Sequence, residues 1–247
     1  MPWHAVETIP IRVGARISPA RARAISDALL QRAVPLSLFK DGRAEPLATA
    51  ALVRDGNRVG LVTAAHIFEH AREGDIAVAL PRDGRIVRLR SVRVHVVSHQ
   101  VNDVAIVWIA NPLAYRLCEN WQVSSIPNES MQPSGDASSY VLAGYPACNA
   151  RRVDGLVYVK PLVLFTGAID ADRYTYSRTA ERIDGVTIWS PELDGVSGAM
   201  LWHITDDVAD EVACILQPAA LQVAFSHSTH LRGEPIACVV DLINRRR

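Results

Sequence analysis

The sequence predicts an all-β fold of two antiparallel, roughly six-stranded β-barrels, preceded by a helical extension at the N-terminus. After Val34 the chain consists of short runs rich in Val, Ile and Leu, separated by Gly, Pro, Asn and Asp. These runs form two groups on either side of residues 111–137, which are rich in Pro, Asn, Ser and Gly and are predicted to be a linker. Two such groups fit either two packed barrels or a pair of sandwiches.

Residues 1–33 are predicted to form the helical extension. Ser18 can cap the helix and is followed by a proline, which suits a first helical turn. The run ARARAISDALLQRA then places Ile25, Leu29 and Leu30 on one side of the helix. We expect this apolar side to pack against the rest of the protein.

The first barrel is predicted to span residues 34–127. The runs VPLSLF, TAALV, RVGLVTA and DIAVAL are typical of strands, and Asp-Gly-Asn at 55–57 is typical of a hairpin turn. The run RIVRLRSVRVHVV alternates apolar residues with Arg and His, which predicts a strand pair with one face in water. VAIVWI is continuously apolar and predicts a buried strand.

The second barrel is predicted to span residues 128–247 and to end in a short tail. Its β-rich runs are SSYVLAGYP, GLVYVKPLVLFTGAI, RYTYSRT, GVTIWS, GAMLWHI, VACILQP and PIACVVDLI. The last three residues are all Arg, and we expect them to be solvated.

Composition limits the classes of function. Lys plus Arg and Asp plus Glu number 26 each, so no charge excess indicates binding to nucleic acid or to an anionic membrane. The N-terminal residues show no basic region followed by an apolar run, and no stretch reaches the ~18 apolar residues of a membrane span. The four cysteines are widely spaced without a C-x-x-C pair, as expected of free thiols in a reducing compartment. Together these features predict a cytoplasmic location.

Three segments carry residues suited to nucleophilic catalysis. They are LVTAAHIFEH with His66, VNDVAIVWI with Asp103, and LDGVSGAMLW with Ser197 between Gly195 and Gly198. A serine hydroxyl needs a neighbouring base to take its proton, and a histidine has the pKa for that task. A buried carboxylate then fixes the tautomer of the imidazole. Backbone amides, for which Gly195 and Ser197 are candidates, bind the developing oxyanion.

The motifs T-A-A-H, D-V-A-I and G-V-S-G resemble the His, Asp and Ser signatures of trypsin-like (chymotrypsin-fold) serine proteases, of the bacterial intracellular type. Their order along the chain is that of the family, with 103 − 66 = 37 and 197 − 103 = 94 residues between them. LAGYP at 142–146 resembles an early strand of the second barrel in bacterial members. The resemblance implies a serine endopeptidase with the triad His66, Asp103 and Ser197, an acyl-enzyme, no cofactor, and an extended protein or peptide substrate.

Several departures from the family pattern narrow this expectation. Ile67 replaces a frequent Cys, Ala199 ends the serine motif in place of Gly, and Ala-Thr-Ala at 48–50 replaces a G-x-G. Val196 replaces the Asp that pairs with a freed amino terminus in digestive members, so that route of activation is not expected here. We expect narrow specificity or a regulatory protein partner to restrain the enzyme instead. Pro191, six positions before the serine, gives no support for cleavage after Lys or Arg.

Two alternatives and one further residue remain. HIFEH matches the zinc motif H-x-x-E-H with His66, Glu69 and His70, but only a short turn fits before Gly74, so no metal is expected. His230 in STHLRG is a candidate specificity residue. The rival function is a catalytically inactive or latent protease-fold module that binds a partner.

Overall fold

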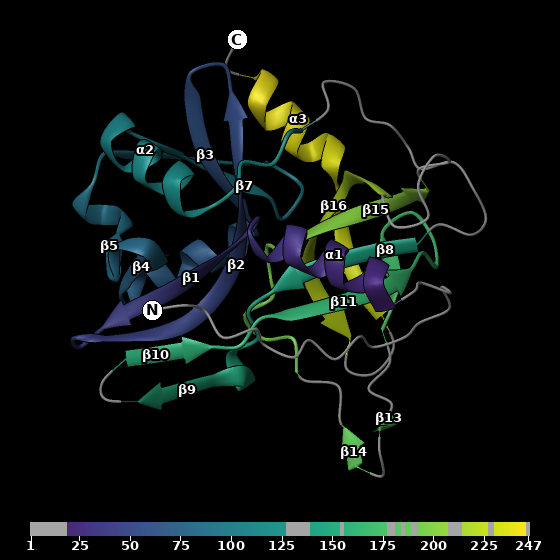
Figure 1. Ribbon diagram of the computed structural model, residues 1–247. Coiled ribbons are helices and arrows are strands. Elements are labelled where there is room, and N and C mark those ends of the chain that lie inside the picture. Colours follow the sequence, from purple (N-terminus) through teal and green to yellow (C-terminus); the bar gives the residue numbers. More distant parts are fainter. Residues whose placement is uncertain are drawn as a thin grey trace.

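Two curled antiparallel sheets, each forming a half-barrel, make up the body of the protein (Figure 1). The computed structural model describes residues 19–126, 139–153, 156–176, 181–183, 186–188, 192–206, 214–226 and 230–245. No helix among these residues has the length and apolar character that a membrane crossing requires. The predicted all-β double-barrel fold is confirmed, and a helix precedes it as expected.

The first sheet has seven strands within the described residues, one more than predicted, in the order β5-β4-β1-β2-β3-β7-β6. Their bounds are β1 Ala33–Lys40, β2 Arg43–Asp55, β3 Arg58–Thr63, β4 Asp75–Leu80, β5 Arg85–Arg88, β6 Val94–Ser98 and β7 Ala105–Ile109. The predicted hairpin turn joins β2 and β3, with Gly56 at a φ of 57°. β7 is buried at every position, as its continuous apolar run predicted.

The predicted strand pair within RIVRLRSVRVHVV is wrong. β5 pairs with β4, whereas β6 pairs with β7, so the two strands lie at opposite edges of the sheet. A short 3-10 helix, Leu89–Ser91, separates them. Alternation identified two half-exposed strands, but it carries no information about which neighbour each strand pairs with.

The second sheet has the order β11-β8-β15-β16-β17-β12. Its strands are β8 Ser139–Gly144, β11 Leu162–Gly167, β12 Arg173–Thr175, β15 Met200–Asp206, β16 Cys214–Ser226 and β17 His230–Pro235. Among the described residues, two small two-stranded sheets accompany it. One is formed by β9 Ala150–Val153 and β10 Leu156–Val159, the other by β13 Glu181–Ile183 and β14 Val186–Ile188.

Helices account for two further differences from the sequence-based expectation. The predicted helix is α1, Pro19–Leu30, which packs on β8 and β11 with Ile25 and Leu29 buried. The predicted linker contains a helix, α2 Asn111–Asn120, and the predicted strand PIACVVDLI is a helix, α3 Ile236–Asn244. Short apolar runs do not distinguish a strand from a buried helix by periodicity, which explains the error at α3.

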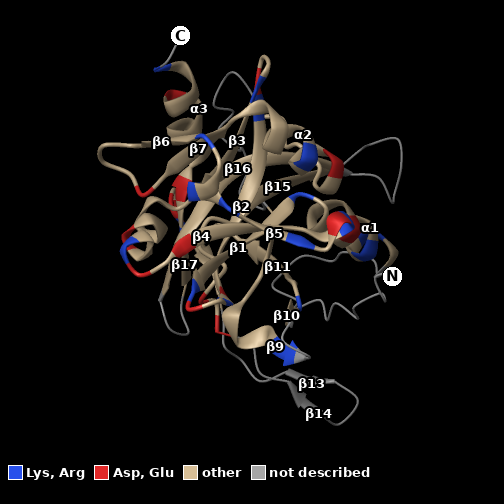
Figure 2. Cartoon of the chain, turned by 90° about the vertical axis from the view of Figure 1, so that its left-hand side faces the viewer, with Lys and Arg blue, Asp and Glu red and all other residues tan. Residues whose placement is uncertain are grey.

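One large apolar core connects the two sheets. It includes Val62 and Ile106 of the first sheet together with Val141 and Trp202 of the second. A second, smaller cluster lies within the second sheet and includes Leu193 and Val196. Figure 2 shows basic and acidic residues distributed along many elements of the described chain, in keeping with the balanced charge of the sequence.

Candidate active site

His66 and Asp103 meet because two neighbouring strands end side by side. In the antiparallel pairing of β3 with β7, Thr63 lies opposite Ala105. The chain continues past Thr63 into a 3-10 helix, Ala65–Arg72, and it enters β7 through Asp103 and Val104. The amide of Ala65 donates to the carbonyl of Asp103 at 3.3 Å. The register therefore sets His66 next to Asp103 before any side-chain contact is formed.

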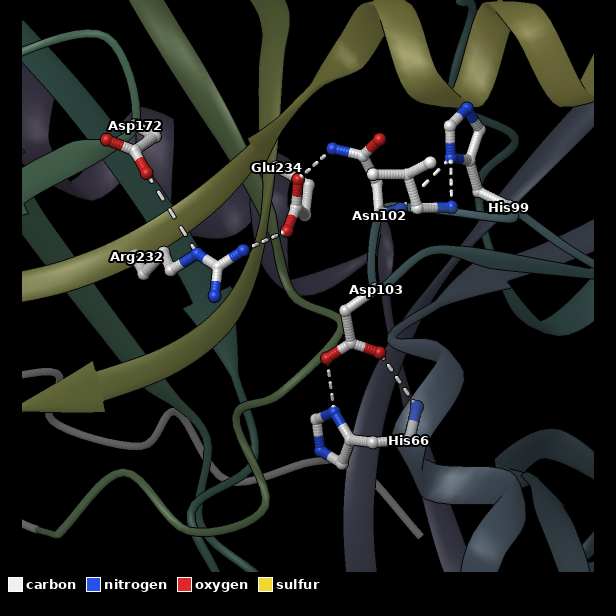
Figure 3. A network of polar contacts seen from close by, with 8 residues as sticks. His66, His99, Asn102, Asp103, Asp172, Arg232 and Glu234 are labelled. Atoms are coloured by element: carbon white, nitrogen blue, oxygen red, sulfur yellow. Dashed lines mark hydrogen bonds and ion pairs between the residues drawn. The ribbon is translucent and has the colours of Figure 1, made fainter.

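The Asp103 carboxylate binds His66 through both oxygens (Figure 3). Oδ2 lies 2.5 Å from Nδ1 of the His66 ring, and Oδ1 accepts a hydrogen bond of 2.8 Å from the His66 backbone amide. A carboxylate at Nδ1 holds the proton on that nitrogen. The Nε2 atom is then the basic nitrogen of the ring.

The contact shifts the pKa of each partner. The side-chain hydrogen bond to Asp103 raises the pKa of His66 above 6.5, although burial opposes the shift. Burial by itself raises the pKa of the Asp103 carboxyl, but the hydrogen bonds from His66 outweigh it and the net pKa falls below 3.8. At neutral pH the carboxylate is therefore charged and stabilises a protonated His66.

A residue of the second sheet anchors the loop that carries Asp103. Asn102 Nδ2 donates to Oε2 of Glu234 at 2.5 Å, and Arg232 donates to Oε1 of the same carboxylate at 2.7 Å (Figure 3). Glu234 lies on β17 and is only 3% exposed. The backbone amide of Asn102 also donates a hydrogen bond to Nδ1 of His99 at 3.1 Å. Sequence reasoning missed Glu234, because its partner lies 132 residues away.

Ser197 lies in a tight turn just before β15. Gly195 and Gly198 both have a φ of 89°, and the Val196 and Ala199 amides each close a turn at 2.9 Å, onto Leu193 and Val196 respectively. A Cβ at Gly198 would lie 2.2 Å from both the Thr49 carbonyl oxygen and the Thr63 hydroxyl. No other residue fits there, because glycine alone combines that approach with a positive φ.

The turn is thereby packed against the segment that leads to His66. Thr63 comes three residues before His66, and the Thr49 amide donates to the Ser197 carbonyl at 2.9 Å. Within the described residues the structure joins His66 to Asp103 by hydrogen bonds and brings the Ser197 turn alongside, without a hydrogen bond from the Ser197 hydroxyl to His66.

Two backbone amides of the turn are available to a ligand. The carbonyl of Asp194 accepts from the Ala147 amide at 2.6 Å, and the carbonyl of Val196 accepts from the Ala199 amide at 2.9 Å. In a trans peptide the N–H points opposite to the C=O, so the Gly195 and Ser197 N–H groups point away from those donors. Among the described residues neither group donates a hydrogen bond. Free donors of this kind suit an anionic oxygen.

The remaining candidates lie elsewhere. His230 is the first residue of β17, is half-buried, and pairs in register with Thr175 and Ser226. At the usual strand rise it lies about 13 Å along β17 from Glu234. Its role in specificity stays a prediction. Pro191 lies outside the described residues.

The two histidines of the zinc motif contact separate carboxylates. The ring of His66 contacts Asp103, and the ring of His70 contacts Glu73 at 3.1 Å. In the part of the chain that the structure describes, no three His, Cys, Asp or Glu side chains are grouped so as to hold a metal ion.

Comparison with known proteins supports the fold. No family model matches the sequence, and no curated protein matches it. Human heparin binding protein has a similar structure at 13% identity and a TM-score of 0.53, over 95% of this chain and 96% of that chain. Serine protease AL20 from an extremophilic microorganism is similar at 10% identity and 0.52, over 90% and 98%. Protease Anisep from Arthrobacter nicotinovorans is similar at 11% identity and 0.50, over 86% and 94%. At these identities the likeness shows the fold, which is that of chymotrypsin-like serine proteases.

Proposed function

We propose that the protein is a serine endopeptidase that uses Ser197 as nucleophile, His66 as base and then acid, and Asp103 to orient His66. The observation that carries the proposal is the pair of hydrogen bonds between His66 and Asp103, formed next to a glycine-flanked serine whose turn has two free amides. Each group has the chemistry that amide hydrolysis requires, and the hydrogen bond from the Thr49 amide to the Ser197 carbonyl supports a common location at the junction of the two sheets.

The proposed reaction gives each group one task. The Ser197 Oγ attacks the scissile carbonyl carbon while His66 Nε2 takes the hydroxyl proton. The carbonyl π electrons move to oxygen, and the Gly195 and Ser197 amides bind the resulting oxyanion. Collapse of this intermediate breaks the C–N bond, and His66 returns its proton to the leaving amine. Water then repeats the sequence on the acyl-enzyme with His66 as base, releasing the acid and the free serine.

The substrate in this proposal is an extended segment of a protein or peptide. Val196 is buried without exposure to solvent, at the position where a charged residue would be needed to pair with a freed amino terminus. Restraint of the activity then falls to narrow specificity or to a regulatory protein partner. We place the enzyme in the cytoplasm on the sequence features given above.

Labelling with a fluorophosphonate tests the proposal. Ser197 Oγ forms a bond to phosphorus, fluoride leaves, and His66 takes the serine proton, so the probe needs the nucleophile and the base but no known substrate. We expect the intact chain to be labelled at one site, Ser197→Ala to lose the label while keeping its melting temperature, and His66→Ala to be labelled far more slowly. A peptide-library cleavage profile would then define the specificity.

Absence of labelling in the folded wild-type chain would overturn the proposal in favour of a binding module. One structural neighbour is named as a heparin binding protein, so the fold is also found in proteins that are named for binding. Heparin affinity chromatography of the unlabelled chain would then be the next measurement.

A further inference from the structure

Thr49 is a first-sheet residue whose hydrogen bonds go mainly to the second half of the molecule. It lies on β2 and is 0% exposed. Its amide donates to the Ser197 carbonyl at 2.9 Å, and its hydroxyl donates to the Gly195 carbonyl at 2.9 Å. The same hydroxyl accepts from the Tyr145 amide at 3.0 Å, and the Thr49 carbonyl accepts from the Thr63 hydroxyl at 2.9 Å. Every polar atom of Thr49 is therefore used.

The direction of the hydroxyl proton is fixed by its two partners. The Tyr145 amide can only donate and the Gly195 carbonyl can only accept. The single Thr49 hydroxyl proton must therefore point at Gly195. Because all three groups are buried, loss of the hydroxyl would leave an amide and a carbonyl without partners.

The hydrogen bond from the Thr49 hydroxyl restrains Gly195, a residue whose backbone is intrinsically flexible. Gly195 has a φ of 89°, and a Cβ there would lie 2.7 Å from the Tyr145 carbonyl oxygen and 3.0 Å from the Ala147 amide nitrogen, so the position requires glycine. Glycine permits many backbone angles. The peptide before Gly195 is tied through the Asp194 carbonyl to Ala147, and the peptide after it is tied to Thr49. These two bonds restrain both backbone angles of Gly195.

Apolar packing alone does not provide this control. Val196 is fully buried, and a Cβ on Gly144 would lie 2.9 Å from Val196 Cγ1 and 3.2 Å from the Thr49 hydroxyl, so both side chains occupy the space above Gly144. Packing of Val196 fixes the position of the turn. The Val196 side chain has no polar atom with which to set the direction of a peptide group, whereas a hydrogen bond has a preferred angle. The peptide after Gly195 is also bonded within the turn, from the Val196 amide to the Leu193 carbonyl at 2.9 Å. The Thr49 hydroxyl is the contact that ties this peptide to the first sheet.

We propose that Thr49 is a positioning residue for the oxyanion-binding amides: its hydroxyl, held on the first sheet, fixes the peptide after Gly195, which lies between the two peptides that carry the Gly195 and Ser197 N–H groups, and thereby holds those groups in place. The inference rests on the proposed function of this site. It assigns the Ala-Thr-Ala sequence at 48–50, which departs from the G-x-G of the family that the motifs resemble, a task in the reaction.

The experiment measures the second-order rate constant for fluorophosphonate labelling, per folded protein, in Thr49→Val and Thr49→Ser. The phosphoryl oxygen gains negative charge during attack and needs the two amides. Removal of one oxyanion donor typically costs about 10²–10³-fold, so misalignment in Thr49→Val should slow labelling about 10- to 100-fold. Thr49→Ser retains the hydroxyl and should stay within about threefold of the wild type. The pH midpoint of labelling, which reports on His66, should be unchanged in both.

Thr166→Val is the matched control. Thr166 is 2% exposed on β11, and its hydroxyl donates to the Thr175 carbonyl at 2.6 Å. The substitution removes the same buried hydroxyl away from the turn, so it should lower the melting temperature without changing the labelling rate.

Equal labelling rates for Thr49→Val and Thr166→Val would overturn the inference and leave Thr49 as a structural residue. If Thr49→Val does not fold, Thr49→Ser against Thr49→Cys decides, because the two side chains have similar shape but the thiol is a weak donor. A slower cysteine variant supports the inference, and equal rates overturn it. Failure of the wild type to be labelled is a different result, which removes the proposed function itself.

Discussion

The two sheets build their shares of the candidate site in different ways. The first sheet brings His66 and Asp103 together through the register of two neighbouring strands, and the bonds between them stay within that sheet. The second sheet carries Ser197 on a turn that is held from outside, by Thr49 of the first sheet and by contact of Gly198 with Thr63. A pair at the ends of adjacent strands is formed by the register of one sheet, and the second sheet adds only the bond from Glu234 to Asn102 beside it. A turn held across the junction needs both sheets and their docking.

Replacement of Asp103 by Asn is the strongest expected perturbation of the first-sheet pair. The amide cannot keep the proton on Nδ1 of His66, and changes of this kind in triad enzymes lower the rate by about 10⁴-fold. Stability should change little, because Asn keeps the size of the side chain. The fluorophosphonate rate and the melting temperature measure the two effects. A labelling rate within tenfold of the wild type would show that Asp103 does not orient the base.

Gly198→Ala should be the most damaging change to the junction between the sheets. The new Cβ would lie 2.2 Å from the Thr49 carbonyl oxygen and from the Thr63 hydroxyl, and the φ of 89° disfavours alanine. Overpacking together with backbone strain predicts a loss of about 3–5 kcal/mol in the free energy of unfolding. Urea denaturation measures it.

The control for Gly198→Ala is Gly84→Ala, at a φ of 61° with no atom within 4 Å of the new Cβ. It carries the cost of a positive φ without the steric conflict, about 1–2 kcal/mol. Similar losses in the two variants would mean that close approach of the turn to the first sheet is not what requires glycine at 198.

Glu234→Ala tests the contact that runs the other way, from the second sheet to the Asp103 loop. The substitution leaves the side-chain amide of Asn102 and the guanidinium of Arg232 without the Glu234 carboxylate. This predicts a loss of about 2 kcal/mol in the free energy of unfolding. Loosening of the Asp103 loop should also slow labelling about tenfold. Glu234→Gln, which keeps an acceptor for Asn102, should lose less of both.

Asp75→Ala serves as the comparison for Glu234→Ala. Asp75 is a carboxylate with 6% exposure at the start of β4, and it contacts Arg90 at 2.6 Å. This variant should be destabilised without a change in the labelling rate. If Glu234→Ala is labelled at the same rate as Asp75→Ala, Glu234 stabilises the fold but does not position the Asp103 loop for the reaction.

The smallest expected effects are those of pH, and they distinguish His66, which follows β3 of the first sheet, from His203, which lies on β15 of the second. The pKa of His66 is raised, so its contribution to stability is complete below pH 6.5 and is lost as the pH rises through the raised pKa. Burial lowers the pKa of His203 on β15, so its neutral form is favoured in the fold and stability is lost as the pH falls from 6.5 towards the lowered pKa.

Melting temperature against pH should therefore be highest near 6.5, the ordinary pKa of both groups. Asp103→Asn should flatten the alkaline side, and His203→Phe the acidic side. Labelling should increase as His66 loses its proton, over the same interval in which the alkaline side loses stability. A labelling midpoint below 6.5 in the wild type would contradict the raised pKa of His66.

What the sequence predicts well is local. The hairpin at Gly56, the helix with Ile25 and Leu29 buried, and the buried strand β7 all follow from turn chemistry and periodicity. The strand predicted at 235–243 is a helix, because a continuous apolar run has no period to read. His66, Asp103 and Ser197 were found through short motifs, and their catalytic roles stay predictions.

The contacts that connect the sheets lie beyond such reasoning. Thr49 bonds to Gly195 across 146 positions, and Asn102 bonds to Glu234 across 132. Neither pair shares a turn, a period or a motif. The sequence signal for these contacts is the threonine between two alanines at 48–50. Its role can be inferred only from the structure, which places the Ser197 turn beside it.

The reciprocal bonds have a consequence for how the molecule would lose function. Thr49 of the first sheet bonds to the turn that carries Ser197, and Glu234 of the second sheet bonds to Asn102 in the loop that carries Asp103. A small rotation of one half-barrel against the other would break both tethers together, while each half kept its own strand pairing. Inactivation by heat or denaturant should then precede the loss of secondary structure, and a compound wedged between the halves would inhibit without touching any reacting atom.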